Sequence, residues 1–228
     1  MARTGEQLYD PVQGDSIEFR ETARDTGGAL LSGVWTAVGD TPLHVHPLQE
    51  EHFEVLSGTV GIQIEDEQRS LGEGEQATVP PGTPHRWYSE DDQEEKARFL
   101  FELRPALNTE ILLETLYGLA TDGNTDRNGL PKPLQMAVIL NGLHKGEIYL
   151  ATPPIAVQKA LFALLSPLGK LVGYRDHYPK YSGADTPSEE GAGPPSKTSV
   201  MARGVAMAAP LLVASLFLLG RMRRRNKG

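Results

Sequence analysis

The sequence predicts a mainly β fold followed by helices, and three observations lead to this prediction. Residues 14–104 contain short runs of alternating apolar and polar residues, separated by glycine, proline and acidic turns. Two histidine-containing stretches in this region, residues 39–58 and 74–89, have spacings that suit strands of one barrel. Residues 106–181 instead carry apolar residues at helical spacing.

The predicted strands follow one another along the chain, and each is ended by turn residues. Ser57-Gly58 predicts one turn, residues 65–68 a hairpin tip, and residues 80–84 a proline-rich turn. The charged run at residues 90–95 predicts a solvated loop, and Arg104-Pro105 ends the β region. The strands themselves are expected at residues 17–19, 29–38, 52–56, 59–64, 76–79, 85–88 and 98–103.

Three helices are expected after the β region. Asn108 is predicted to cap the first, which Asp122-Gly123 ends, and the second covers residues 134–143. The third is predicted to begin at Thr152-Pro153. Its apolar face favours packing against the barrel or against a second copy of the chain, and the alternative is a helix lying on a membrane surface. The residues of that face are Val157, Leu161, Leu164, Leu165, Leu168 and Val172.

The two histidine-containing stretches together have the composition of one metal site. His44 and His46 are two residues apart, so on a strand both side chains point to the same face. Glu51 has odd spacing from His46, and Pro47 is expected to interrupt the strand between them. With His85 from the second stretch, three imidazoles and one carboxylate can converge on a divalent first-row metal.

The spacing of these residues resembles that of the cupin superfamily over roughly residues 28–103. The first motif of that family is a glycine, HxH, four residues, a glutamate, six residues and a glycine, and the second is a glycine, five residues, PxG, two residues, a histidine, three residues and an asparagine. This chain departs in two places: Gly39 lies one residue nearer to the HxH than usual, and Ser89 replaces the asparagine. The residues that match in register are His44, His46, Glu51 and Gly58, then Gly74, Pro80, Gly82 and His85.

The resemblance implies a fold and a set of metal ligands. The fold is a double-stranded β-helix, the jelly-roll barrel of the cupins. The implied ligands are His44, His46, Glu51 and His85, and the metal is a divalent transition metal such as Fe, Mn, Ni, Cu or Zn. Glu50 is a rival for Glu51, but the spacing to Gly58 favours Glu51.

The predicted site indicates two classes of function. The first is a metal-dependent oxygenase or isomerase of a small apolar or carbonyl compound, and the second is a non-catalytic module that binds a metal or a small molecule. Acid–base groups beyond the ligands are sought at Glu54, Gln63 and Tyr88, and none of them is decisive. The expected pocket wall is apolar and consists of Trp35, Phe53, Trp87 and Tyr88.

Charge and composition exclude some functions. The 228-residue chain has a net charge of -8 and no cysteine, which excludes disulfides and thiol catalysis. Residues 1–104 contain 8 Lys and Arg against 21 Asp and Glu. So acidic a domain would repel phosphates, and nucleic acid is not an expected partner. The expected partners are a small-molecule ligand, membrane lipid and a second copy of the chain.

The sequence also predicts a membrane anchor near its end. Gly204 to Gly220 carries no charge over 17 residues, and a basic cluster follows. The basic residues after this segment favour a cytoplasmic C-terminus, but residues 1–20 contain no apolar leader that would export the barrel. A single-pass C-terminal anchor with the barrel in the cytoplasm is therefore expected, and the alternative is that residues 155–172 also cross the membrane. The predicted organisation is a barrel at 1–104, a helical appendage at 105–181, a linker at 182–199, a transmembrane helix at 200–221 and a basic tail at 222–228.

Overall fold

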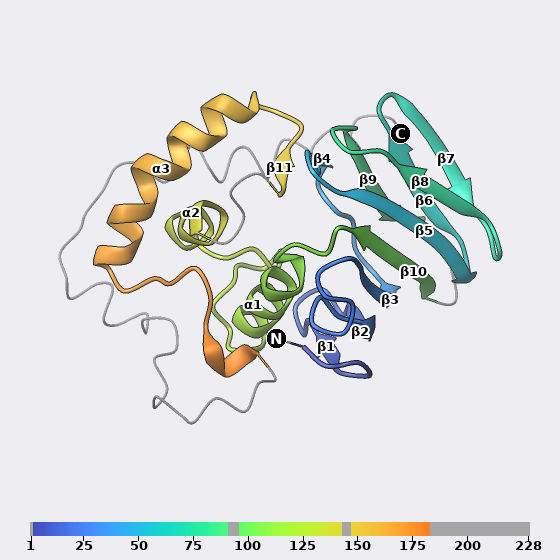
Figure 1. The fold of residues 1–228 in the computed structure, drawn as a ribbon, viewed down its shortest axis with the longest axis horizontal. Helices are drawn as coiled ribbons and strands as arrows, with labels where there is room; N and C mark the ends of the chain where they lie inside the picture. Colours follow the sequence, from blue (N-terminus) through green and yellow to red (C-terminus); the bar gives the residue numbers. More distant parts are fainter. Residues whose placement is uncertain (1, 91–95, 143–146, 183–228) are drawn as a thin grey trace.

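The computed structural model describes residues 2–90, 96–142 and 147–182, and within them the chain forms a β barrel with helices at its side. The larger antiparallel sheet has the strand order β1-β2-β3-β10-β5-β8, and the smaller sheet has the order β11-β4-β9-β6-β7 (Figure 1). The mainly β prediction is therefore confirmed, together with the helices that follow it.

The strands agree closely with the alternating runs of the sequence. The expected strands are present, and β1, β7 and the two-residue strands β4 and β11 are additional to them. In chain order the strands are β1 (Gln7–Tyr9), β2 (Ser16–Glu21), β3 (Leu31–Ala37), β4 (His44–Val45), β5 (Glu50–Ser57), β6 (Val60–Ile64), β7 (Glu67–Leu71), β8 (Gln76–Val79), β9 (His85–Ser89), β10 (Ala97–Arg104) and β11 (Tyr149–Leu150).

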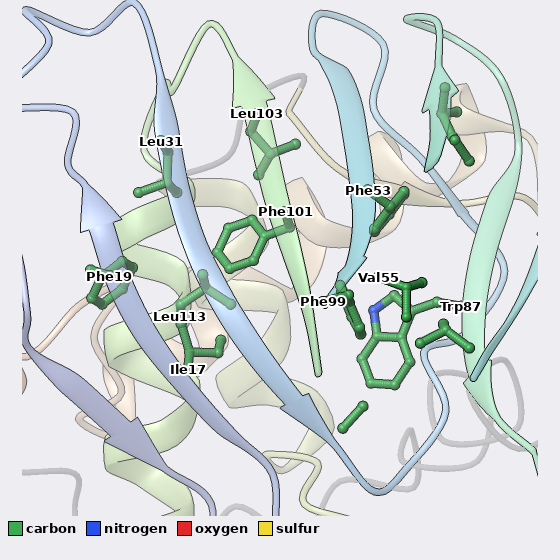
Figure 2. Packing of buried hydrophobic residues seen from close by; sticks show 14 of the residues in the cluster. Ile17, Phe19, Leu31, Phe53, Val55, Trp87, Phe99, Phe101, Leu103 and Leu113 are labelled. Carbon is green, nitrogen blue, oxygen red and sulfur yellow. The ribbon is translucent and has the colours of Figure 1, made fainter. Parts of the chain in front are cut away.

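Alternation along the strands determines which side chains fill the barrel. On β5, Phe53 and Val55 are buried, and their strand partners on β10 are Phe101 and Phe99. Trp87 enters from β9 in the opposite sheet, and its ring centroid lies 5.2 Å from that of Phe99. Figure 2 shows these side chains packed together between the two sheets. The apolar core therefore lies on the same inward face that carries Glu51.

Three helices follow β10 and lie beside the barrel, and the described residues from 105 onward are called the appendage below. The helices are α1 (Thr109–Thr121), α2 (Pro133–Gly142) and α3 (Ile155–Leu171), followed by a 3-10 turn at Pro179–Tyr181. Leu113 of α1 packs into the barrel core. The other two helices form a second cluster with Tyr149 of β11 and Val45 of β4. Figure 1 shows β11 extending from this side of the molecule to β4.

The predicted helix starts agree in one case and differ in another. Asn108 is the N-cap residue of α1, as predicted, but its side chain makes no capping hydrogen bond and instead donates to Glu147 at 2.8 Å. The third helix begins at Ile155 instead of Pro153, because Pro154 has an extended backbone, with ψ of 142°, and is the N-cap residue.

The predicted membrane localisation is contradicted. No helix within the described residues is long and apolar enough to cross a bilayer, so the single-pass C-terminal anchor and the transmembrane helix are not supported. The segment proposed for that helix, residues 200–221, lies outside the described residues, as do the linker beyond Ser182, the basic tail and residues 91–95 of the predicted loop.

The close contact between α2 and α3 yields a stability prediction. A Cβ atom added at Gly169 would lie 2.4 Å from Val138 Cγ2 and 2.9 Å from the Leu134 carbonyl oxygen. Gly169→Ala should therefore lower the free energy of unfolding by about 1–3 kcal/mol, as overpacking typically does. Leu164→Ala on the exposed face of the same helix is the matched control and should change it by less than about 0.5 kcal/mol. Urea unfolding measures both, and a Gly169→Ala variant as stable as the wild type would show that the helices are not in close contact there.

Candidate metal centre

Four side chains of ligand type meet at one end of the barrel. His44 lies on β4 and pairs across the ladder with His85, the first residue of β9. His46 follows β4 directly, and Glu51 is the second residue of β5. All four are buried, and one ligand atom from each lies within 4.8 Å of the others. The structure therefore brings together the three histidines and the glutamate that the sequence indicates.

The imidazole rings are oriented by main-chain carbonyls. His44 Nδ1 lies 2.8 Å from the Pro42 oxygen, His85 Nδ1 lies 2.9 Å from the Thr83 oxygen, and His46 Nδ1 lies 3.0 Å from the Glu147 oxygen. A carbonyl can only accept, so each Nδ1 must carry the proton. When His44 and His46 are neutral, their Nε2 atoms then carry a free lone pair, which is the form that binds a metal. His85 instead donates from Nε2 to Glu51 and would have to lose that proton to bind a metal.

Glu51 lies at the centre of the cluster. Its Oε2 atom is 2.7 Å from His85 Nε2 and 3.5 Å from His46 Nε2. Burial raises the pKa of Glu51, but the hydrogen bond from His85 and the neighbouring imidazoles lower it more, to about 2. Glu51 is therefore a carboxylate at neutral pH. For His85, burial lowers the pKa, yet the hydrogen bond to Glu51 and its charge give a net increase.

The other two histidines are held neutral. Burial lowers the pKa of His44 to about 3, and the neighbouring His85 and His46 act in the same direction. The pKa of His46 is also lowered, again mainly by burial. Neutral imidazoles and an ionised carboxylate are the protonation states that a divalent metal requires. The donor set, its orientation and the protonation states of His44, His46 and Glu51 therefore fit a divalent transition metal, and His85 would bind it after losing its Nε2 proton.

The structure distinguishes Glu51 from its neighbour Glu50. Along β5 the buried positions are Glu51, Phe53 and Val55, while Glu50 is exposed. Because neighbouring side chains on a strand point to opposite faces, Glu50 cannot reach the three histidines without a change of register.

Three of the four pocket residues indicated by the sequence, Trp35, Phe53 and Trp87, lie in the same apolar core, and Tyr88 does not. Phe53 is the nearest of them to the cluster, with its ring centroid 6.4 Å from that of His85. Trp87 shares the inward face of β9 and lies edge-on to Trp35, with centroids 5.0 Å apart in the core. Tyr88 points to the other face, where it packs over Gly61: a Cβ there would come within 2.0 Å of the Tyr88 ring.

Two further residues of the site are not indicated by the sequence analysis. Gln49, 1% exposed, places its Oε1 atom 3.1 Å from His46 Nδ1. Glu147, 6% exposed, supplies the carbonyl described above. Gln49 lies inside the first motif, and its place beside Glu50 and Glu51 could have drawn attention to it. Glu147 lies 101 residues from His46 and has no local sequence signal.

Comparison with known proteins supports a cupin domain in the barrel. Residues 36–101 match the family described as the cupin domain, and this range includes all four clustered residues. The match supports the cupin superfamily for this part of the chain, in agreement with the two sheets and the buried cluster.

Relatives over longer stretches carry oxidoreductase names. An oxidoreductase of Arthrobotrys oligospora is 27% identical over 153 residues, which are 62% of this chain and 59% of that protein, so this chain spans only part of its length. The probable oxidoreductase virH of Hypocrea virens is 28% identical over 195 residues, 78% of this chain and 87% of that protein.

Solved structures overlap with the chain only in part. A sugar phosphate isomerase from a cupin superfamily of Silicibacter pomeroyi is 16% identical, has a TM-score of 0.37 and covers 43% of this chain and 70% of its own. The structure of KdgF from Halomonas sp. is 22% identical, has a TM-score of 0.36 and covers 43% of this chain and 84% of its own.

The adjacent glutamates provide a test of the ligand set. Glu51→Gln removes the buried negative charge at the centre of the cluster, whereas Glu50→Gln changes an exposed side chain. We expect Glu51→Gln to weaken metal binding by more than the roughly 10–100-fold that is typical of losing an outer-shell partner. Glu50→Gln, the matched control, should bind like the wild type. Elemental analysis after dialysis measures both, and a larger loss in Glu50→Gln would reverse the assignment.

Proposed function

We propose that the barrel binds one divalent metal through His44, His46, Glu51 and His85 and uses it in an enzymatic reaction. The observation that carries this proposal is the convergence of three Nε2 atoms and one carboxylate, with the Nδ1 atom of each imidazole hydrogen-bonded to a main-chain carbonyl. The four ligands leave positions open on a six-coordinate metal. Among the candidate metals, Fe(II) or Mn(II) suits a site built without thiolates.

The proposed reaction is the oxidation, with O₂ as oxidant, of a small apolar or carbonyl compound. A metal bound here would supply a site for O₂ and substrate, or a Lewis acid for a substrate carbonyl. Phe53 presents an apolar ring beside His85 and would orient an apolar substrate. Burial of the ligands limits the access of water. The oxidoreductase names of the relatives support this choice over an isomerase.

A specific observation favours the alternative of a non-catalytic binding module. The three side chains suggested as acid–base groups occupy outward-facing strand positions. Glu54 lies between the buried Phe53 and Val55, and Gln63 accepts a hydrogen bond from Arg86 Nε at 2.9 Å. Tyr88 alternates with the inward-facing Trp87. An enzymatic reaction would therefore depend on the metal and on groups of the substrate itself for its proton transfers.

Metal analysis and oxygen uptake together test the proposal. The full-length chain, purified without oxygen, should contain about one equivalent of Fe or Mn, and uptake of O₂ should depend on one of a panel of aromatic and carbonyl compounds. His85→Ala should lose both the metal and the uptake. The matched control is His52→Ala on the outer side of β5, whose ring contacts Thr78, and it should keep both.

Two results would decide against the enzyme. A chain that holds only tetrahedral zinc with no exchangeable water, and that consumes no O₂ with any compound of the panel, would favour the binding module. A wild-type chain that holds no metal would contradict both the enzyme and a metal-binding module.

A further inference from the structure

The Nδ1 atoms of the three histidines have hydrogen-bond partners in different parts of the chain. The Nδ1 partners of His44 and His85 lie two residues away on their own stretches of chain, at Pro42 and Thr83. His46 Nδ1 instead contacts both the main-chain oxygen of Glu147, in the segment that leads into β11, and the side-chain oxygen of Gln49. The orientation of the His46 ring therefore depends on the appendage, whereas that of the other two depends on local backbone.

Gln49 connects His46 to the start of the appendage. While its Oε1 atom faces His46, its Nε2 atom donates to the carbonyls of Pro105 at 2.9 Å and Ala106 at 3.2 Å, and to Thr109 Oγ1 at 3.0 Å. Carbonyl oxygens can only accept, so they fix the amide with its NH₂ group toward α1 and its oxygen toward the imidazole. The buried amide has its hydrogen bonds satisfied only when α1 is docked on the barrel.

Glu147 makes a second connection to the same place. Its main-chain oxygen accepts from His46, while its carboxylate accepts from the Asn108 main-chain N–H at 3.2 Å and from the Asn108 side chain at 2.8 Å. Both connections from His46 thus end within residues 105–109, where the barrel joins α1.

The appendage also supports the strand that carries His44. β4 lies between β9 and β11 in the smaller sheet, and Leu150 of β11 pairs with His44 itself. Val45, on the other face of β4, is buried in the cluster formed with α2 and α3. Two of the four cluster residues, His44 and His46, therefore lie in backbone that the appendage supports.

We infer that the appendage is a positioning element of the metal centre, and that Gln49 and Glu147 couple its docking to metal binding. This inference rests on the proposed metal site. Coupling is reciprocal: if docking of residues 105–109 favours a metal-ready His46, then metal binding must favour docking by the same factor. Gln49 and Glu147 act through His46, and they are positioning residues rather than ligands.

Metal affinity tests one direction of this coupling. Zn²⁺ is titrated into the full-length chain in competition with a chelating indicator, and Gln49→Ala should bind about 10–100-fold more weakly than the wild type. Gln63→Ala, which removes a glutamine on the outer side of the barrel, is the matched control and should bind within about twofold. Equal affinity in a folded Gln49→Ala variant would overturn the inference.

Hydrogen exchange in the wild-type chain tests the other direction without any substitution. Zn²⁺ should slow exchange in peptides that cover residues 105–112, in addition to residues 44–51 around the ligands. Slowing confined to residues 44–51 would overturn the coupling and leave the metal site intact. A wild-type chain that binds no Zn²⁺ would overturn the proposed function and the inference with it.

A conservative substitution tests the acceptor oxygen of the Gln49 amide separately from its NH₂ donors. Gln49→Glu keeps an acceptor for His46 Nδ1 but removes the donors to Pro105 and Ala106. We expect this variant to bind Zn²⁺ at least as tightly as Gln49→Ala does and to lose the Zn²⁺-dependent protection of residues 105–112. If that protection persists in Gln49→Glu and in Asn108→Ala, the two connections do not transmit the coupling, and the inference fails.

Discussion

The two-residue strand β4 (His44–Val45) is too short to be stable alone, so the cluster of His44, His46, Glu51 and His85 depends on the elements that pack against β4. One neighbour, β9, aligns His44 with His85, and the other, β11, comes from the appendage. Its two faces are buried differently, with His44 in the polar cluster and Val45 among apolar side chains of the helices. Burial of Val45 among these apolar side chains stabilises the position of β4, and its pairing with β9 keeps His44 beside His85.

The charge balance within the site follows from the same placement. Burial alone would drive Glu51 toward the neutral acid, but contact with His85 keeps it ionised, with a pKa of about 2. His44 and His46 are kept neutral by burial. Once His85 loses the Nε2 proton that it donates to Glu51, three neutral imidazoles around one carboxylate have a net negative charge that a divalent cation can compensate, and this is the electrostatic reason for proposing a metal.

Local patterns in the sequence predicted the barrel and the cluster of His44, His46, Glu51 and His85, but they could not predict contacts between distant segments. Alternation along β5 and β9 placed Glu51, Phe53 and Trp87 correctly on the inward face, because strand periodicity is a property of neighbouring residues. The same alternation, applied consistently, would have turned Tyr88 away from Trp87. The Gln49 and Glu147 contacts join segments far apart in the chain, and β11 has too few residues to show a period.

X-ray absorption at the edge of the bound metal tests the central claim most directly, because it reports the ligand atoms themselves. For the full-length chain loaded with one equivalent of metal, we predict scattering from three imidazole rings and from oxygen or nitrogen ligands at about 2.0–2.2 Å. Exchangeable water should occupy the remaining positions, and His46→Ala should reduce the imidazole count to two. A spectrum with one imidazole or none in the wild type would contradict the account, since the metal would then bind elsewhere than the cluster of His44, His46, Glu51 and His85.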